Sequence, residues 1–359
     1  MKRREFLKKA VLGAGLLLYN PIDAPSLQRQ QLDFDPGQRI GRNCLGGMIN
    51  LRARPSASSA VIKSIYEDTL VVWNREVIGD APAGVFSRKW VETPEGYIYS
   101  PSLQPCYNRP NTPLTELPST PDGPGFWGEV TVPYVDIYPV NPPSSPWLKE
   151  VITPRLYYSQ ILWIDGIRQG SNGKPQYHVI EKYGSYGDVY WADAEAFRLV
   201  TEEETSPISP DVENKKIVID IKHQTLSCYE GNSEVYFCRV STGAQYDISG
   251  NRFDEWSTPL GEHPIWRKLI SIHMSGGGTG AGWDTPGVPW TCLFIGEGVA
   301  VHSTFWHNDF GTPRSHGCVN ANSEDAKWIF RWTNPPVAYH TGDITIQGLG
   351  LSTPVEVIA

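Results

Sequence analysis

Ser315-His316-Gly317-Cys318-Val319-Asn320 places a cysteine directly after a glycine and a few residues before the best helix start in the chain. Asn322 or Ser323 can cap that helix, and the acidic residues that follow suit the positive end of its dipole. Apolar side chains within 326–330 recur at the spacing of one helical face. We therefore expect one short helix immediately after Cys318.

The segment before this cysteine is typical of strands. Apolar and polar residues alternate over 217–221, 226–229 and 235–240, which predicts a β-meander. Gly231-Asn232 lies between the last two runs and is typical of a hairpin turn. The chain has 34 Gly, 30 Pro and 13 Trp, with only 19% charged residues, and this composition disfavours both a long helical bundle and a disordered chain. We expect a mainly β protein.

Reactive side chains gather near the end of the chain, in His302-Ser303-Thr304, in Trp306-His307 and around Cys318. A thiol becomes a useful nucleophile when a nearby imidazole takes its proton. Gly317 permits a tight turn, and the helix start that follows favours a thiolate and a developing oxyanion. The cluster therefore predicts acyl transfer by Cys318.

Three other interpretations of Cys318 stay open at this point. It could be a buried structural thiol, or it could form a disulfide with Cys292. It could also bind zinc together with His302, His307 and His316, although their spacing matches no common zinc motif.

His302-Ser303-Thr304 followed by the 315–320 stretch resembles the L,D-transpeptidase (YkuD-type) catalytic domain. The surrounding context agrees, with Ser241-Thr242-Gly243, Thr258-Pro259-Leu260-Gly261 and the run 296–301 that leads into His302. The resemblance covers about 215–350 and implies a β-sandwich with one short helix after the cysteine. Two positions depart from the common pattern: Ser303 stands where the family often has Gly, and Asn320 where Arg is common.

The resemblance implies a role for each matching residue. Cys318 would be the nucleophile, His302 the base, and the Ser303 backbone would orient His302. The amides of Gly317 and Cys318 would form the oxyanion hole, and no metal or organic cofactor would be needed. The donor site would be lined by Ser315, His316, Asn320 and Arg314, with Trp306, Trp283 or Trp290 shaping the cleft.

The implied activity is cross-linking of peptidoglycan stem peptides, which are the expected partners. Cys318 would form a thioester and release D-Ala, and an amine of a neighbouring stem would resolve the thioester. Water as acceptor would make the enzyme an L,D-carboxypeptidase. A cysteine peptidase of the NlpC/P60 type is disfavoured because its cysteine precedes its histidine, and a non-catalytic wall-binding protein is the remaining alternative.

Two earlier segments, 38–107 and 126–200, contain short alternating strands and resemble bacterial SH3-like domains, which are small β-barrels. The second resemblance is the weaker of the two. Asn108 to Gly125 is rich in proline and predicts a linker, and the acidic stretch 201–214 predicts another.

The first thirty residues are typical of an export signal of the twin-arginine type. Arg3-Arg4 and Phe6-Leu7-Lys8 precede an apolar run, 10–19, that is too short to span a bilayer. We therefore expect an exported protein of the cell envelope or cell wall without a stable membrane span. The formal net charge of −8 argues against nucleic acid as a partner, and without a readable dimer surface we expect a monomer.

Six cysteines are compatible with disulfides in that compartment. Cys44 and Cys106 bracket one compact segment and are the best candidate pair. Cys228 and Cys238 flank the expected hairpin but lie off-opposite, so a bridge between them is doubtful.

Overall fold

The computed structural model describes residues 34–81, 85–171, 173–245, 251–252, 254–276, 283–296, 298–348 and 350–359, without the side chain of Trp283. Apart from residue 34, the described residues belong to one compact unit, 35–359. The expected export signal, 1–30, lies outside the described residues. The protein is mainly β. Among the described helices, none is long and apolar enough to cross a membrane.

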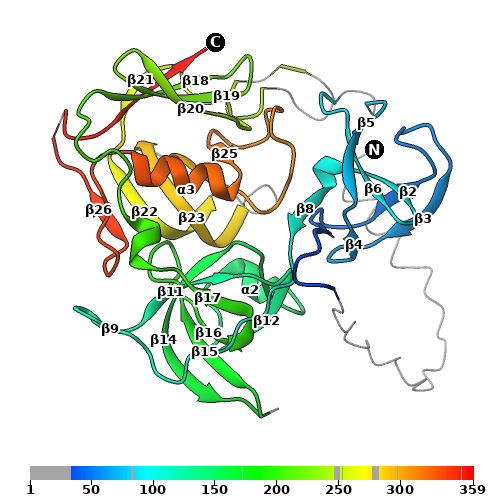
Figure 1. Cartoon of the computed structure of the whole chain (residues 1–359), viewed down its shortest axis with the longest axis horizontal. Helices are drawn as coiled ribbons and strands as arrows, with labels where there is room; N and C mark the ends of the chain where they lie inside the picture. The colour runs from blue at the N-terminus through cyan, green and yellow to red at the C-terminus, as the bar shows by residue number, and fades with distance from the viewer. Residues whose placement is uncertain are drawn as a thin grey trace, which may run out of the picture. The chain divides into compact units, whose positions relative to one another are not determined.

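The first β region, residues 40–106, contains two antiparallel sheets with the orders β4-β1-β8 and β3-β2-β7-β6-β5 (Figure 1). Leu51, Trp73, Val91 and Ile98 are buried between them, so the region has its own small core. The elements are β1 (Ile40–Asn43), β2 (Ile49–Arg52), β3 (Val61–Ile65), β4 (Leu70–Val72), β5 (Arg75–Ile78), β6 (Lys89–Thr93), β7 (Gly96–Tyr99), the 3₁₀-helix η1 (Ser100–Ser102) and β8 (Leu103–Cys106).

The predicted disulfide between Cys44 and Cys106 is wrong. Cys106 pairs with Ile40 across β1 and β8, whereas the Cys44 amide bonds the Ser102 carbonyl, so the strand register sets the two thiols four residues apart along the ladder. Cys228 and Cys238 are off-opposite, as expected from the hairpin. All six cysteines are free thiols.

The second β region, residues 119–199, is built on one seven-stranded sheet with the order β13-β12-β16-β15-β14-β11-β17. Its core contains Phe126, Leu162, Tyr177 and Tyr190. The elements are β9 (Ser119–Thr120), β10 (Gly123–Pro124), β11 (Phe126–Val130), β12 (Tyr134–Pro139), α2 (Pro146–Glu150), β13 (Arg155–Tyr157), β14 (Ile161–Gln169), β15 (Pro175–Ile180), β16 (Val189–Asp193), η2 (Ala194–Ala196) and β17 (Phe197–Leu199).

The third β region, residues 215–358, contains two five-stranded sheets, β20-β19-β18-β27-β21 and β25-β24-β23-β22-β26. Strand β27 runs parallel to β18, although the expected domain ended at residue 350. The elements are β18 (Lys215–Asp220), β19 (Thr225–Glu230), β20 (Ser233–Arg239), β21 (Gly261–Pro264), β22 (Arg267–Gly276), β23 (Trp283–Ile295), β24 (Val299–Ser303), β25 (Val319–Ala321), α3 (Ser323–Trp332), β26 (Asp343–Thr345) and β27 (Pro354–Ile358).

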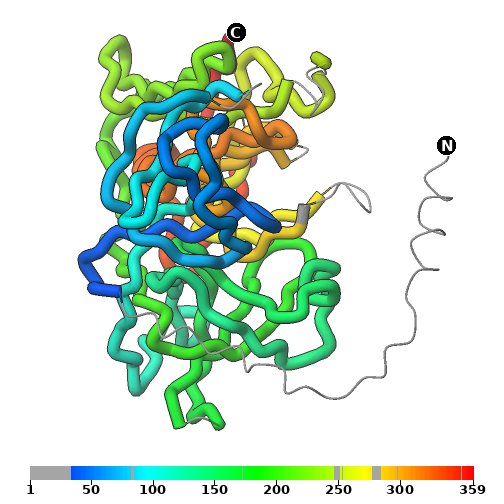
Figure 2. Tube along the Cα trace, turned by 90° about the vertical axis from the view of Figure 1, so that its right-hand side faces the viewer, coloured from blue at the N-terminus to red at the C-terminus, as the bar shows by residue number. Residues whose placement is uncertain are grey.

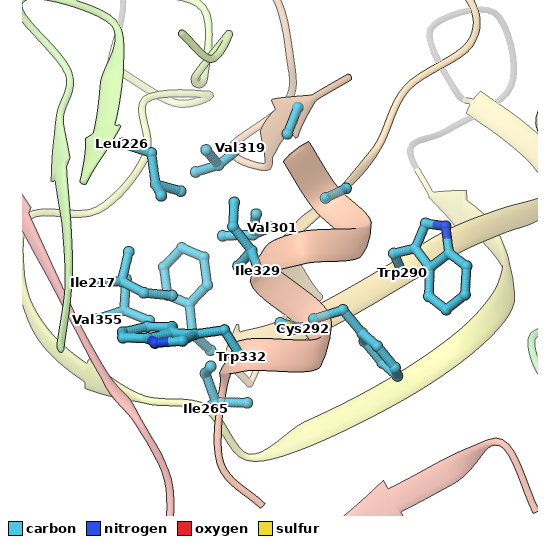
Figure 3. Packing of buried hydrophobic residues seen from close by; sticks show 14 of the residues in the cluster. Ile217, Leu226, Ile265, Trp290, Cys292, Val301, Val319, Ile329, Trp332 and Val355 are labelled. Carbon is cyan, nitrogen blue, oxygen red and sulfur yellow. The ribbon is translucent and has the colours of Figure 1, made fainter. Parts of the chain in front are cut away.

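Helix α3 packs between these two sheets, and its start and buried face confirm the sequence prediction (Figure 1). Asn322 caps it by accepting bonds from the amides of Glu324 and Asp325. In Figure 3, Ile329 and Trp332 lie among side chains from both sheets. Burying this face on two sheets fixes the helix directly behind the strand that follows Cys318.

The two predicted linkers are packed segments. Within 108–125, the Leu114 amide donates to the Tyr177 hydroxyl at 2.7 Å. Within 201–214, the 3₁₀-helix η3 (Glu202–Thr205) presents Glu204 to Arg198 and Lys327. These two cations outweigh the effect of burial and lower the pKa of Glu204 to about 2.

The second and third β regions share one core. Trp127 of β11 is buried in the cluster that α3 fills, and its Nε1 donates to the Tyr339 carbonyl at 2.8 Å. The first β region joins this body through polar contacts, because Arg42 and Arg155 both bond Asp68. In Figure 2 the blue chain of the first β region lies in front of the third β region.

Candidate active site

Parallel pairing of β24 and β25 brings His302 and Cys318 to neighbouring strands. Val301 pairs with Val319 and His302 with Asn320, so Cys318 lies directly before the paired part of β25. Val301 and Val319 face the core behind the site. Because side chains alternate along a strand, His302 and Asn320 face the opposite side.

His302 is 2% exposed and forms one clear hydrogen bond, from Nδ1 to the Ser303 carbonyl at 2.9 Å. A carbonyl only accepts, so Nδ1 carries the proton and Nε2 keeps its lone pair. Burial lowers the pKa of His302 to about 4, against a smaller opposing effect of the Ser303 bond. His302 is therefore neutral near pH 7 and can take a proton at Nε2.

The Cys318 thiol is partly buried. Burial raises the pKa of Cys318 to about 11, and the Ala300 amide acts in the other direction. Among the described residues, Sγ donates its hydrogen bond to the Gly298 carbonyl at 3.5 Å and not to His302. The resting site therefore holds a neutral thiol beside a neutral imidazole, a geometry that tightens in many enzymes only when substrate binds.

The turn before Cys318 is held by hydroxyl groups. The Ser315 hydroxyl accepts from the Gly317 amide at 3.1 Å and donates to the Cys318 carbonyl. The Thr258 hydroxyl donates to the Gly317 carbonyl at 2.8 Å and accepts from the Gly243 amide at 2.9 Å. Gly317 has φ +116°, which side chains rarely permit.

The Gly317 amide and the Ser315 hydroxyl bond each other, which differs from the roles expected for them in the oxyanion hole and the donor site. The Gly317 amide is already bonded to Ser315, whereas we expected it to be free for an oxyanion, because the short Ser315 side chain folds back over the turn. For the same reason the Ser315 hydroxyl bonds within its own loop, whereas we expected it to line the donor site.

Asn320 is 2% exposed, and its amide lies 2.9 Å from His307 Nε2. The Asp309 amide donates to His307 Nδ1, and Asp309 pairs with Arg314 at 3.1 Å. Burial is also the main cause that lowers the pKa of His307 well below its usual value. Asn320 and His307 thus form a buried neutral pair on the side of the sheet that His302 faces, while Arg314 is more exposed.

The segment between the two motifs, 304–314, is held by the earlier regions. The Asn308 side chain donates to the Ser100 hydroxyl at 3.0 Å, and Ser100 donates to Glu76 at 2.7 Å. The ring of Trp306 lies 5.7 Å from the ring of His302. The first β region therefore contacts the segment that joins base to nucleophile.

His316 and Trp290, which we expected near the donor site and the cleft, lie in different surroundings. His316 packs against Trp256, with ring centroids 4.0 Å apart, and burial lowers the pKa of His316. Trp290 is buried in the core against Phe330, so the expectation that it shapes the cleft is wrong. Trp256 and the bridging role of Thr258 escaped prediction, because the residues that they contact lie far away in sequence.

The zinc and disulfide interpretations of Cys318 do not fit the geometry. In the part of the chain that the structure describes, no three His, Cys, Asp or Glu side chains converge as metal ligands. His307 is turned toward Asn320, and His316 toward Trp256. Cys292 is a free thiol buried in the core, 3.7 Å from the Thr333 hydroxyl.

Residues 214–357 match the family model YkuD, described as the L,D-transpeptidase catalytic domain. The match covers less than half of the chain and contains both motifs. No curated protein matches the sequence.

Several solved structures are similar. An L,D-transpeptidase from Mycobacterium smegmatis is 21% identical, with 41% of this chain and 59% of that chain covered and a TM-score of 0.32. A mutant L,D-transpeptidase from Enterococcus faecium is 20% identical, with 41% and 50% covered and a TM-score of 0.30. An L,D-transpeptidase from Mycobacterium tuberculosis is 19% identical, with 48% and 73% covered and a TM-score of 0.30. The chain spans less than two thirds of the first two, and values this low do not define an activity.

Proposed function

We propose that this protein is an L,D-transpeptidase that cross-links peptidoglycan stem peptides through a thioester on Cys318. The observation that carries the proposal is the match of 214–357 to the L,D-transpeptidase catalytic domain, with Cys318 and a neutral, buried His302 on neighbouring strands. The same match supports a cysteine-dependent acyltransferase.

In the first step, Cys318 Sγ attacks the carbonyl that precedes the terminal D-Ala of a donor tetrapeptide. The raised pKa of the thiol and the lowered pKa of His302 mean that neither group is charged at rest. The proton therefore moves to His302 Nε2 while the carbon–sulfur bond forms. His302 then protonates the departing nitrogen, and D-Ala leaves.

In the second step, an amine of a neighbouring stem attacks the thioester, and sulfur departs to regenerate the thiol. Water in place of the amine gives hydrolysis, which is the carboxypeptidase alternative. Ser315 and Gly317 shape the turn that presents the sulfur, and backbone amides near Cys318 stabilise the oxyanion. Arg314, His316 and Trp306 border the donor.

The two earlier β regions serve as SH3-like domains in this proposal. Their contacts with 304–314 and with the core of the third region favour a packing role beside any wall binding. The family's substrate favours an envelope location, reached through the twin-arginine-type segment before residue 30. The protein acts as a monomer.

The test is the intact mass of the purified protein after incubation with a carbapenem, beside the Cys318→Ala variant. β-Lactams offer a carbonyl that such a thiol opens with the same oxyanion geometry. We expect one adduct on the wild type and none on the variant. An unmodified wild type whose Cys318 titrates as a free thiol contradicts the proposal.

A further inference from the structure

A pocket of about 200 Å³ lies where the three β regions meet. Trp147 of the second region and Trp306 of the third supply aromatic walls, and Glu67 of the first stands at its border. Because Trp306 also packs on the ring of His302, one side chain separates the pocket from the proposed base. The pocket is built largely from residues outside 214–357.

The arginines of this pocket are already neutralised. Arg42 bonds Asp68 at 2.7 Å, and Arg155 bonds Asp68 at 2.6 Å and Asp136 at 2.9 Å. Arg42 is also covered by Tyr157, whose ring centroid lies 3.8 Å from its guanidinium carbon. An anionic ligand would have to compete with these carboxylates, so the arginines do not make an anion site.

On the other side of the pocket, carboxylates outnumber cations. Asp284 lines the pocket and shares the single imidazole of His273 with Glu181. Glu67 is exposed, and no cation pairs with it within the described ranges. The Glu67 carboxylate is close enough to Tyr157 to contribute, after burial and Asp68, to raising the pKa of that phenol to about 12.

We propose that this pocket receives the primary ammonium group of the acceptor strand, an inference that rests on the proposed function. An excess of carboxylates beside indole faces attracts a compact cation through charge and through the ring quadrupoles. The earlier β regions thereby select the acceptor.

Two protons must leave the acceptor nitrogen when the acyl group moves from Cys318 to it. The ammonium first loses one proton to water, which frees its lone pair. The nitrogen attacks the thioester carbonyl, a carbon–nitrogen bond forms and the carbon–sulfur bond breaks. The second proton of the nitrogen passes to the departing sulfur, so the products are an amide, the Cys318 thiol and one released proton.

The experiment compares two nucleophiles on the same acyl-enzyme, formed by the full protein from a synthetic tetrapeptide stem that ends in D-Ala. Nα-acetyl-lysine amide is a cation at pH 7, whereas methoxyamine is neutral. We measure the ratio of the two amide products by mass spectrometry. Relative to the wild type, Glu67→Gln lowers the lysine-to-methoxyamine ratio about threefold and Glu67→Lys about tenfold, as expected for a partly screened charge.

The matched control is Glu95→Lys, which reverses an exposed carboxylate of the same β region outside the pocket. It leaves the ratio at the wild-type value. A ratio that Glu67→Lys does not change, or that Glu95→Lys lowers equally, overturns the inference while D-Ala release still supports the proposed function. A wild type that releases no D-Ala overturns both.

Discussion

Two buried histidines of the third β region, His273 on β22 and His302 on β24, have opposite electrostatic surroundings. His273 lies between Glu181 and Asp284, at 2.6 Å from the first. Burial alone would lower the pKa of His273, but bonds and charges from these two carboxylates raise it. His302 contacts a backbone carbonyl, and burial lowers its pKa to about 4.

The contrast shows how one residue type serves two purposes in one sheet. His273 is held as an imidazolium that joins the second β region to the third, since Glu181 belongs to one and Asp284 to the other. Asp284 also accepts from the Trp147 amide at 2.8 Å, which fixes α2. His302 is held neutral and can therefore act as a base.

The largest expected effect is on catalysis at His302. His302→Ala removes the proton acceptor, and we expect carbapenem acylation of Cys318 to slow by about 100- to 10,000-fold. Stopped-flow kinetics measure the rate. His223→Ala, an exposed histidine paired with Asp220, is the control and keeps the wild-type rate. Equal rates for His302→Ala and the wild type would remove His302 as the base.

His273 should instead govern stability. His273→Ala leaves two carboxylates buried without their cation, which costs about 3–5 kcal/mol of the free energy of unfolding. Urea denaturation measures the loss, again with His223→Ala as control. A loss below about 1 kcal/mol would mean that the two regions are not joined through this imidazole.

The pH dependence separates the two histidines by sign. Below about pH 6.5 the unfolded chain protonates His302 while the folded chain does not, so the wild type loses about 2 kcal/mol relative to His302→Gln between pH 7.5 and 5.0. Relative to His273→Gln, the wild type gains stability over the same fall, because the raised pKa of His273 favours the folded state until pH rises through it. Urea midpoints at both pH values check this, and shifts of the same sign would refute it.

A smaller effect is expected where the first β region holds 304–314. In a double-mutant cycle, Asn308→Ala and Ser100→Ala should show a coupling of about 0.5–1.5 kcal/mol in unfolding and a severalfold slower acylation. Additive energies with unchanged acylation would show that the first β region does not position this segment.

Sequence patterns predicted the helix after Cys318, the β-meander and the hairpin at Gly231, because each depends on local spacing or turn chemistry. The expectation that Cys318 and His302 act together came from two short motifs and the family resemblance that they carry, and the structure places the two residues on neighbouring strands. Local patterns did not predict the contact of His273 with Glu181 or that of Asn308 with Ser100, since each pair lies far apart in sequence. Strand β27 was missed for the same reason.

The two proline-rich or acidic segments show a different limit. Composition indicates where a chain avoids regular structure, but it does not show whether such a segment is packed. In 108–125 the Leu114 amide bonds the Tyr177 hydroxyl, and in 201–214 Glu204 pairs with Arg198 and Lys327. The strand register likewise sets Cys44 and Cys106 apart along the ladder, and both thiols stay free. Such outcomes depend on tertiary packing that alternation and spacing do not encode.

The most direct test of the central claim is incubation of the protein with a tetrapeptide stem that ends in D-Ala, followed by intact mass and product analysis. We predict a thioester on Cys318 that lacks the D-Ala mass, free D-Ala and a cross-linked dimer, all missing with Cys318→Ala. An unmodified Cys318 and an intact stem, from a folded protein whose thiol titrates as free, would contradict the account.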